Sequence, residues 1–185
     1  MQVSLKTLCH TLFEAAASVA EVNVFDFDDT LVRTTSYIYL TKSDGKQVTL
    51  TPGEYAMYNA EPGDVFDFSD FKDVKNPTPI SHMLLKLKFA VRTLGPNNVF
   101  ILTARGAADP IIKFLDGVGV SGIRVVALNS GDPQAKATVI RNEILRRGVK
   151  IVKFFDDSAK NVAAVRELRR DPAIPDDVQI LSVRV

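Results

Sequence analysis

Acidic side chains follow two apolar runs of the sequence, one early in the chain and one late. They are Asp26, Asp28 and Asp29 after the first run, and Asp156 and Asp157 after the second. Burying several carboxylates in one place costs several kcal/mol per charge unless a cation or a proton compensates them. Oxygen ligands with no nearby His or Cys favour Mg²⁺ over zinc or copper. If the two acidic groups meet in the fold, the sequence therefore predicts a magnesium site.

The elements that would position these acids alternate between strands and helices. Five β-branched and aromatic runs predict buried strands at 22–27, 98–104, 123–128, 150–155 and 178–183. Helical spacing of apolar residues predicts helices at 81–94, 107–118, 134–148 and 158–170. This alternation is typical of an α/β fold, a Rossmann-like three-layer sandwich with a central parallel sheet. Because such sheets bind ligands beyond the carboxyl ends of their strands, the acids should converge there, joined by Thr103 and Arg105.

The order of these motifs resembles that of the haloacid dehalogenase (HAD) superfamily. The motifs are DFDDT at 26–30, a hydrophobic strand that ends in Thr103, Lys136 on a helix, and the acidic pair at 156–157. The resemblance spans residues 22–161. Each motif falls where the α/β pattern independently predicts a strand end or the start of a helix, so the HAD fold is the expected variant of the sandwich.

The resemblance implies a phosphatase that works through an aspartyl-phosphate intermediate. Asp26 would be the nucleophile, because carboxylates form such covalent intermediates. Asp28, an acid that the dehalogenases of the superfamily lack, would protonate the leaving oxygen and then activate water. Thr103 would hydrogen-bond a phosphoryl oxygen. Lys136 would stabilise charge on the transferring group and on Asp26.

The resemblance also implies where the metal would bind. Asp26, the backbone carbonyl of Asp28, and Asp156 with or without Asp157 would hold Mg²⁺, which lets an anionic substrate approach an anionic nucleophile. Ser158 or Asp157 can cap the helix that begins near 158. Asn161 would then point back toward the acidic pair and brace it.

Several of these assignments have alternatives. Thr103 can be a simple strand-end cap. Lys136 is preferred to Lys150 and Lys153 because it precedes Asp156 by twenty residues, as is usual in the superfamily, whereas the other two flank or lie within a strand. Arg105 can either bind the substrate phosphate or form a salt bridge.

The segment from about 32 to 79 departs from the alternating pattern. Its runs YIYL and KQVTL predict a β-hairpin that turns at Ser43, Asp44 and Gly45. We treat this segment, called the flap below, as an insert in a single domain that covers residues 1–185. All four tyrosines lie in it, namely Tyr37, Tyr39, Tyr55 and Tyr58. Their rings could stack on a nucleobase or form an apolar cluster that holds the hairpin down.

Composition limits the setting of the protein. The 185 residues carry a formal charge of +1, which excludes a polyelectrolyte with strong overall attraction to nucleic acid or membranes. No run is long and apolar enough for a membrane span, and one cysteine, Cys9, indicates a reducing compartment, so we expect a cytoplasmic protein. The first twenty residues fit an amphipathic helix that packs on the core better than a signal peptide.

Three classes of function stay open. Residues 131–136 (GDPQAK) and the triplet at 103–105 are similar to the 3'-phosphatase domain of phage polynucleotide kinases, which implies nucleotides or nucleic acid ends as substrates. Residues 136–170 hold ten Lys or Arg against four Asp or Glu, so this edge could attract anions. A small metabolite or sugar phosphate is the second candidate. The third is a non-catalytic binding protein, since a fold does not dictate function.

Overall fold

A parallel sheet of five strands forms the centre of the protein, in a computed structural model that describes residues 20–185. The strands are β1 (Glu21–Phe25), β7 (Val99–Thr103), β8 (Arg124–Ala127), β9 (Ile151–Asp156) and β10 (Gln179–Arg184). Their order in the sheet is β10-β9-β1-β7-β8, and all neighbouring pairs are parallel. All five predicted strands are thereby confirmed, with ends that differ by one or two residues.

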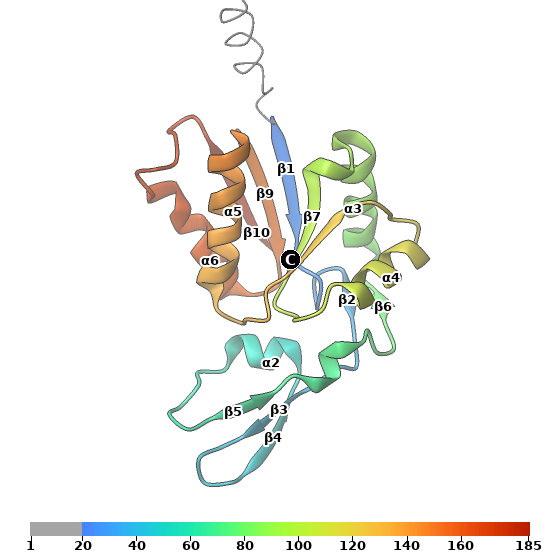
Figure 1. Cartoon of the computed structure of the whole chain (residues 1–185), viewed down its shortest axis with the longest axis vertical. Helices are drawn as coiled ribbons and strands as arrows, with labels where there is room; N and C mark the ends of the chain where they lie inside the picture. Colours follow the sequence, from blue (N-terminus) through green and yellow to red (C-terminus); the bar gives the residue numbers. More distant parts are fainter. Residues whose placement is uncertain (1–19) are drawn as a thin grey trace, which may run out of the picture.

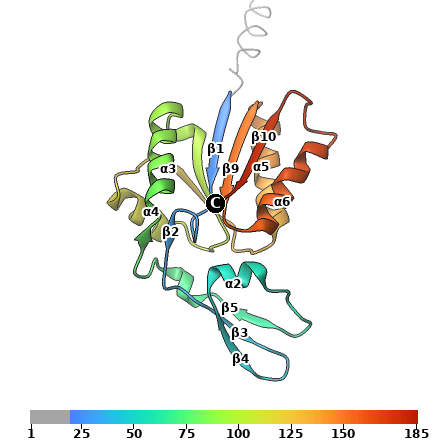
Figure 2. The ribbon, with the colours of Figure 1, turned by 180° about the vertical axis from the view of Figure 1, so that it is seen from behind.

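Helices cover both faces of the sheet, as the sequence predicts. They are α3 (Ser81–Leu94), α4 (Asp109–Gly117), α5 (Pro133–Arg147) and α6 (Ala159–Glu167). Helices α3 and α4 lie on one face, and α5 and α6 on the other (Figures 1 and 2). Because side chains alternate along a strand, β1 sends Val22 and Val24 into the core beneath α5 and α6, and Phe25 into the core beneath α3. The result is an α/β fold compatible with a Rossmann-like sandwich.

The ends of two helices show why the sequence places them there. At the start of α5, the Asp132 side chain accepts a hydrogen bond from the backbone N–H of Gln134, and Pro133 occupies the first turn. At its end, Gly148 adopts the left-handed conformation with φ of 63°, which glycine tolerates without strain. Helix α6 begins after Ser158, whose side chain accepts from the N–H of Asn161. The start of α6 matters most, because it adjoins the acidic pair.

The flap contains the predicted hairpin. Its elements are β2 (Val32–Arg33), β3 (Ile38–Thr41), β4 (Gln47–Leu50), α2 (Pro52–Met57), β5 (Val65–Asp67), a 3-10 turn (Ser69–Lys72) and β6 (Thr78–Pro79). Strands β3 and β4 pair antiparallel, and the Asp44 side chain accepts from the N–H of Lys46 in the turn. Strand β5 pairs with the other side of β3, and this third strand and helix α2 were not predicted.

The flap lies across the carboxyl ends of the sheet strands, below them in Figure 1. It has its own apolar cluster, in which the buried side chains are Ile38, Leu40, Leu50 and Phe71. Within residues 20–185, no helix is long and apolar enough to cross a membrane. The predicted N-terminal helix and Cys9 lie outside the described residues.

Candidate active site

Three neighbouring strands bring the predicted site residues together. Asp26 follows β1 directly, Thr103 is the last residue of β7, and Asp156 is the last residue of β9. Since β1 lies between β7 and β9, their carboxyl ends meet at one edge. From β1 the chain continues to β7 and β8 on one side of β1, and later to β9 and β10 on its other side. The strand order therefore reverses between β1 and β9, where Asp26 and Asp156 lie. Open α/β sheets bind ligands at such points.

A buried ion network joins Asp26, Lys136 and Asp156. The Nζ atom of Lys136 lies 2.7 Å from Oδ1 of Asp26 and 2.8 Å from Oδ2 of Asp156. All three side chains are almost fully buried, with at most 6% of each residue exposed. Lys136 reaches the acids from the first turn of α5, where the Asp132 cap holds the start of the helix.

Lys150 and Lys153, the two alternatives to Lys136, lie elsewhere. Lys150 pairs with Asp177, and Lys153 pairs with Glu21. Among the three lysines, the described contacts therefore bring only Lys136 to the acids, in agreement with the prediction.

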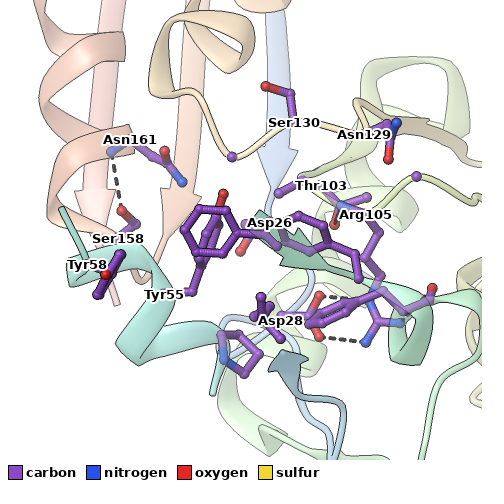
Figure 3. A pocket seen from close by; sticks show the side chains of 18 of the residues that line it. Asp26, Asp28, Tyr55, Tyr58, Thr103, Arg105, Asn129, Ser130, Ser158 and Asn161 are labelled. Carbon is purple, nitrogen blue, oxygen red and sulfur yellow. Dashed lines mark hydrogen bonds and ion pairs between the residues drawn. The ribbon is translucent and has the colours of Figure 1, made fainter. Parts of the chain in front are cut away.

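The start of α6 holds the Asp156 carboxylate in place. The backbone N–H of Ser158 donates to Oδ1 of Asp156 at 2.8 Å, and the Asn161 side-chain amide donates to both carboxylate oxygens at 3.0 Å. Figure 3 shows Ser158 and Asn161 side by side at the pocket. The predicted cap by Ser158 is confirmed, and the predicted brace by Asn161 is confirmed for Asp156 of the acidic pair.

Carboxylate oxygens of Asp26, Asp156 and Asp157 all lie within 4.8 Å of one another. Asp157 lines the adjoining pocket, whereas Asp156 lies behind it with both oxygens accepting hydrogen bonds. Asp157 is therefore the more accessible member of the acidic pair. The Asp28 carboxylate is not part of this cluster and faces Arg105 instead.

Burial and the closeness of like charges shift the pKa values of the residues in the cluster. Burial, followed by the charges of Asp156 and Asp157, raises the pKa of Asp26 well above the ordinary carboxyl value, although Lys136 opposes the shift. Burial and the neighbouring Asp156 raise the pKa of Asp157 to about 6. Burial alone would lower the pKa of Lys136, but the charges of Asp26 and Asp156 outweigh it and the pKa rises, so this lysine is protonated. Three carboxylates and one ammonium carry a formal charge of −2, which a divalent cation would neutralise.

Thr103 is 1% exposed and lines the pocket beside Asp26. Its hydroxyl oxygen accepts a hydrogen bond from the N–H of Arg105 at 3.2 Å. Thr103 therefore caps the end of its strand, which was the alternative to a role in binding a phosphoryl oxygen. A hydroxyl that accepts one hydrogen bond can still donate its own proton, so the cap does not exclude contact with a ligand.

Arg105 forms the salt bridge that was one of its two alternatives. Its guanidinium donates two hydrogen bonds to the Asp28 carboxylate, from Nε to Oδ2 and from Nη2 to Oδ1, each 2.8 Å long (Figure 3). The arginine residue is 3% exposed. The structure thus joins Arg105 to the predicted acid, and Arg105 also lines the pocket that contains this acid.

A pocket of about 990 Å³ opens beside the acids and reaches under the flap. On the side of the sheet it is lined by Asp26, Asp28, Thr103 and Lys136. On the side of the flap it is lined by five aromatic rings, those of Tyr55, Tyr58, Phe66, Phe68 and Phe71. The three phenylalanines were not predicted as part of the site, although the repeated Phe between 66 and 71 was a signal for them.

The four tyrosines divide into two pairs. Tyr55 and Tyr58 pack against the apolar cluster of the flap, which was one of the two roles considered for the tyrosines, and they also line the pocket. Stacking of a base on them stays a prediction. Tyr37 and Tyr39 are about 40% exposed and are not among the pocket-lining residues. The Tyr39 hydroxyl donates to the exposed side of the flap at Asp70 instead. Stacking of a base in this pocket is therefore not expected at Tyr37 or Tyr39.

Tyr55 also closes the gap between the flap and the sheet. A side chain at Gly131 would place its Cβ 2.7 Å from the Tyr55 ring, closer than carbon atoms approach. The absence of a side chain at 131 thus lets the tyrosine reach the loop that follows β8.

No family model matches the chain, and no curated protein shows significant similarity to it. Function is therefore inferred from the geometry of the site.

Proposed function

We propose that this protein is a Mg²⁺-dependent phosphomonoester hydrolase of the HAD type that forms an aspartyl phosphate on Asp26. One observation carries the proposal. Lys136 bridges the buried carboxylates of Asp26 and Asp156, with an oxygen of Asp157 within 4.8 Å, at the inner end of a large pocket. Such a cluster, placed at the carboxyl ends of parallel strands, suits the binding of a cation together with a phosphate group.

The donor set of the cluster fits magnesium. It consists of carboxylates only, and its formal charge of −2 with Lys136 matches a dication. Asp26 and Asp157, with Asp156 behind them and the backbone carbonyl of Asp28, would hold the ion. When bound, Mg²⁺ offsets the repulsion between the anionic substrate and the carboxylates and polarises a phosphoryl oxygen.

The protein's own residues would perform the transfer in two steps. An oxygen of Asp26 attacks phosphorus, and the bond from phosphorus to the leaving oxygen breaks. Asp28, which must enter this step protonated, gives its proton to that oxygen, so that the alcohol departs. Asp28 then takes a proton from water, whose oxygen attacks phosphorus. The bond between phosphorus and Asp26 breaks, inorganic phosphate leaves, and both carboxyl groups return to their starting states.

Lys136 and Thr103 would stabilise the charge that develops during transfer. The Lys136 ammonium already lies 2.7 Å from Asp26, so it would accompany the nucleophile throughout the reaction. The Thr103 hydroxyl lines the pocket on the neighbouring strand, where it can donate to a phosphoryl oxygen. Fixed donors of this kind act without reorganising at the moment of reaction.

The aromatic side of the pocket favours nucleotides or nucleic acid ends among the candidate substrates. A phosphate group alone is far smaller than the cavity of about 990 Å³. Rings of Tyr55, Phe66 and Phe68 lie with centroids 5.3 to 6.2 Å apart and form a continuous apolar wall opposite the acids. Aromatic faces bind nucleobases by stacking. A sugar phosphate would leave this wall unused.

A phosphatase screen tests the proposed function. We expect hydrolysis of p-nitrophenyl phosphate and of nucleotides with Mg²⁺, loss of activity in EDTA, and recovery when Mg²⁺ is added. Asp26→Asn should abolish turnover, and Asp116→Asn, an exposed carboxylate on α4, is the matched control. If nucleotides, 3'-phosphorylated oligonucleotides and sugar phosphates all fail as substrates with Mg²⁺ present, the non-catalytic binding protein becomes the better account.

A further inference from the structure

Arg105 links two parts of the molecule that are far apart in the sequence. It lies in the loop after β7, and its planar guanidinium holds both oxygens of Asp28, 77 residues earlier in the chain. A carboxylate held at both oxygens by one guanidinium has a fixed orientation, since rotation would break at least one of the two bonds.

The other side of the same guanidinium holds the flap. Nη1 of Arg105 donates to the backbone carbonyl of Asp73 at 2.7 Å and lies 3.4 Å from that of Phe71. Its central carbon lies 4.6 Å from the centre of the Phe71 ring, within cation–π distance. Nη2 also lies within 3.5 Å of the hydroxyl oxygens of Thr34 and Ser36, where the chain enters the flap.

These contacts use the donors of Arg105 almost completely. A guanidinium has five N–H donors, and here Asp28, two flap carbonyls and two hydroxyls are within reach of them. A lysine at 105 would carry the same charge but could not hold Asp28 at two oxygens and the flap carbonyls at once.

We propose that Arg105 is a positioning residue that couples the flap to Asp28. It fixes the Asp28 carboxyl relative to the flap backbone at 71–73, so the acid is set in place when the flap lies over the pocket. The coupling itself rests on the contacts above. Its consequence for catalysis rests on the proposed function, in which Asp28 protonates the leaving group.

Hydrogen exchange tests the coupling without any activity measurement. In Arg105→Lys we expect amide exchange in the segments 34–36 and 71–75 to rise at least about tenfold, with β1 and β9 unchanged. Asp28→Asn, which removes the charge that Arg105 binds, should increase exchange in the same two segments, and the double variant should add little to either single change.

Arg141→Lys is the matched control for hydrogen exchange. Its partner Asp171 lies away from the flap, so exchange at 71–75 should stay at the level of the unchanged protein. Two results would overturn the coupling: unchanged exchange at 71–75 in both Arg105→Lys and Asp28→Asn, or a uniform rise through the sheet, which would mean general destabilisation.

The kinetic test compares leaving groups. An alkoxide needs protonation by Asp28 far more than p-nitrophenolate does, so a misplaced acid should slow the alkyl ester selectively. For Arg105→Lys we expect kcat on glycerol phosphate to fall at least about tenfold, and kcat on p-nitrophenyl phosphate to fall less than about threefold, with little change in KM.

Other kinetic outcomes count against a positioning role. A higher KM with unchanged kcat would mean that Arg105 binds the phosphate directly, and an equal fall of kcat on both esters would remove the link to Asp28. If the unaltered protein hydrolyses neither ester with Mg²⁺, the proposed function fails, and the hydrogen-exchange result still decides whether Arg105 couples the flap to Asp28.

Discussion

Lys136 is the residue whose loss the site should tolerate least. Its ammonium compensates two buried carboxylates, so Lys136→Met would leave Asp26 and Asp156 without a cation. Breaking a buried ion pair on one side costs about 3–5 kcal/mol, and we expect that loss in the free energy of unfolding, measured by denaturant in EDTA. Mg²⁺ should restore part of it.

The control for this variant is Lys150→Met. Lys150 pairs with Asp177 on the surface, where an ion pair contributes at most about 1 kcal/mol. If both lysine variants lose the same stability, the network around Lys136 is not the centre of charge compensation that we describe.

The raised pKa values of Asp26 and Asp157 predict how stability depends on pH. Both carboxyls bind protons more tightly in the folded than in the unfolded protein, whose ordinary value is 3.8. Metal-free protein should therefore lose stability as the pH rises from about 4 toward 6, the folded pKa of Asp157. Mg²⁺ competes with these protons, so the rise in Tm on adding Mg²⁺ should be larger at pH 7.5 than at pH 5. An equal rise at both pH values would contradict a metal site at these acids.

The sequence predicted only part of the set of residues that come together in the candidate site. Asp26 directly follows one strand of the parallel sheet, and Thr103 and Asp156 end two others, so their convergence at one end of the sheet follows from the fold class. The partner of Arg105 does not follow from any local pattern. It depends on the path by which the flap leaves and re-enters the sheet, which brings the carbonyl of Asp73 and the carboxylate of Asp28 to the same guanidinium.

At the scale of elements, the sheet and its helices were predictable because each has a strong period and a clear end. Helix α3 matches its predicted bounds, 81–94, and α5 differs from its predicted bounds, 134–148, by one residue at each end, with Gly148 as its C-cap. Helix α2 was missed because it has six residues and begins with Pro52 and Gly53, which are typical of turns. Its capping box, in which Thr51 and Glu54 bind each other's backbone, was the available signal.

The aromatic wall of the flap predicts substrate selectivity. Tyr55→Ala and Phe68→Ala should raise KM for a nucleotide about tenfold, because stacking of a base contributes about 1–3 kcal/mol. KM for ribose phosphate, which has no base, should change little. Tyr37→Ala is the control, since Tyr37 does not line the pocket. Equal effects on both substrates would show that the wall serves packing alone.

At the scale of the whole molecule, the sheet supplies the acids and the flap supplies the far wall of the pocket. Neither part suffices for the proposed reaction, since the acids alone would bind any phosphate and the aromatic rings alone hold no nucleophile. The fold by itself does not decide between an enzyme and a binding protein. What favours an enzyme is that Asp26, Asp28 and Lys136 are all present and all line the same pocket.

Trapping the covalent intermediate is the most direct test of this account. The protein is mixed with radiolabelled substrate and Mg²⁺, quenched in acid within one turnover, and digested to locate the label. The account predicts label on the peptide that contains Asp26, none in EDTA and none in Asp26→Asn. Steady Mg²⁺-dependent hydrolysis with no labelled protein, or label that persists in Asp26→Asn, would contradict it.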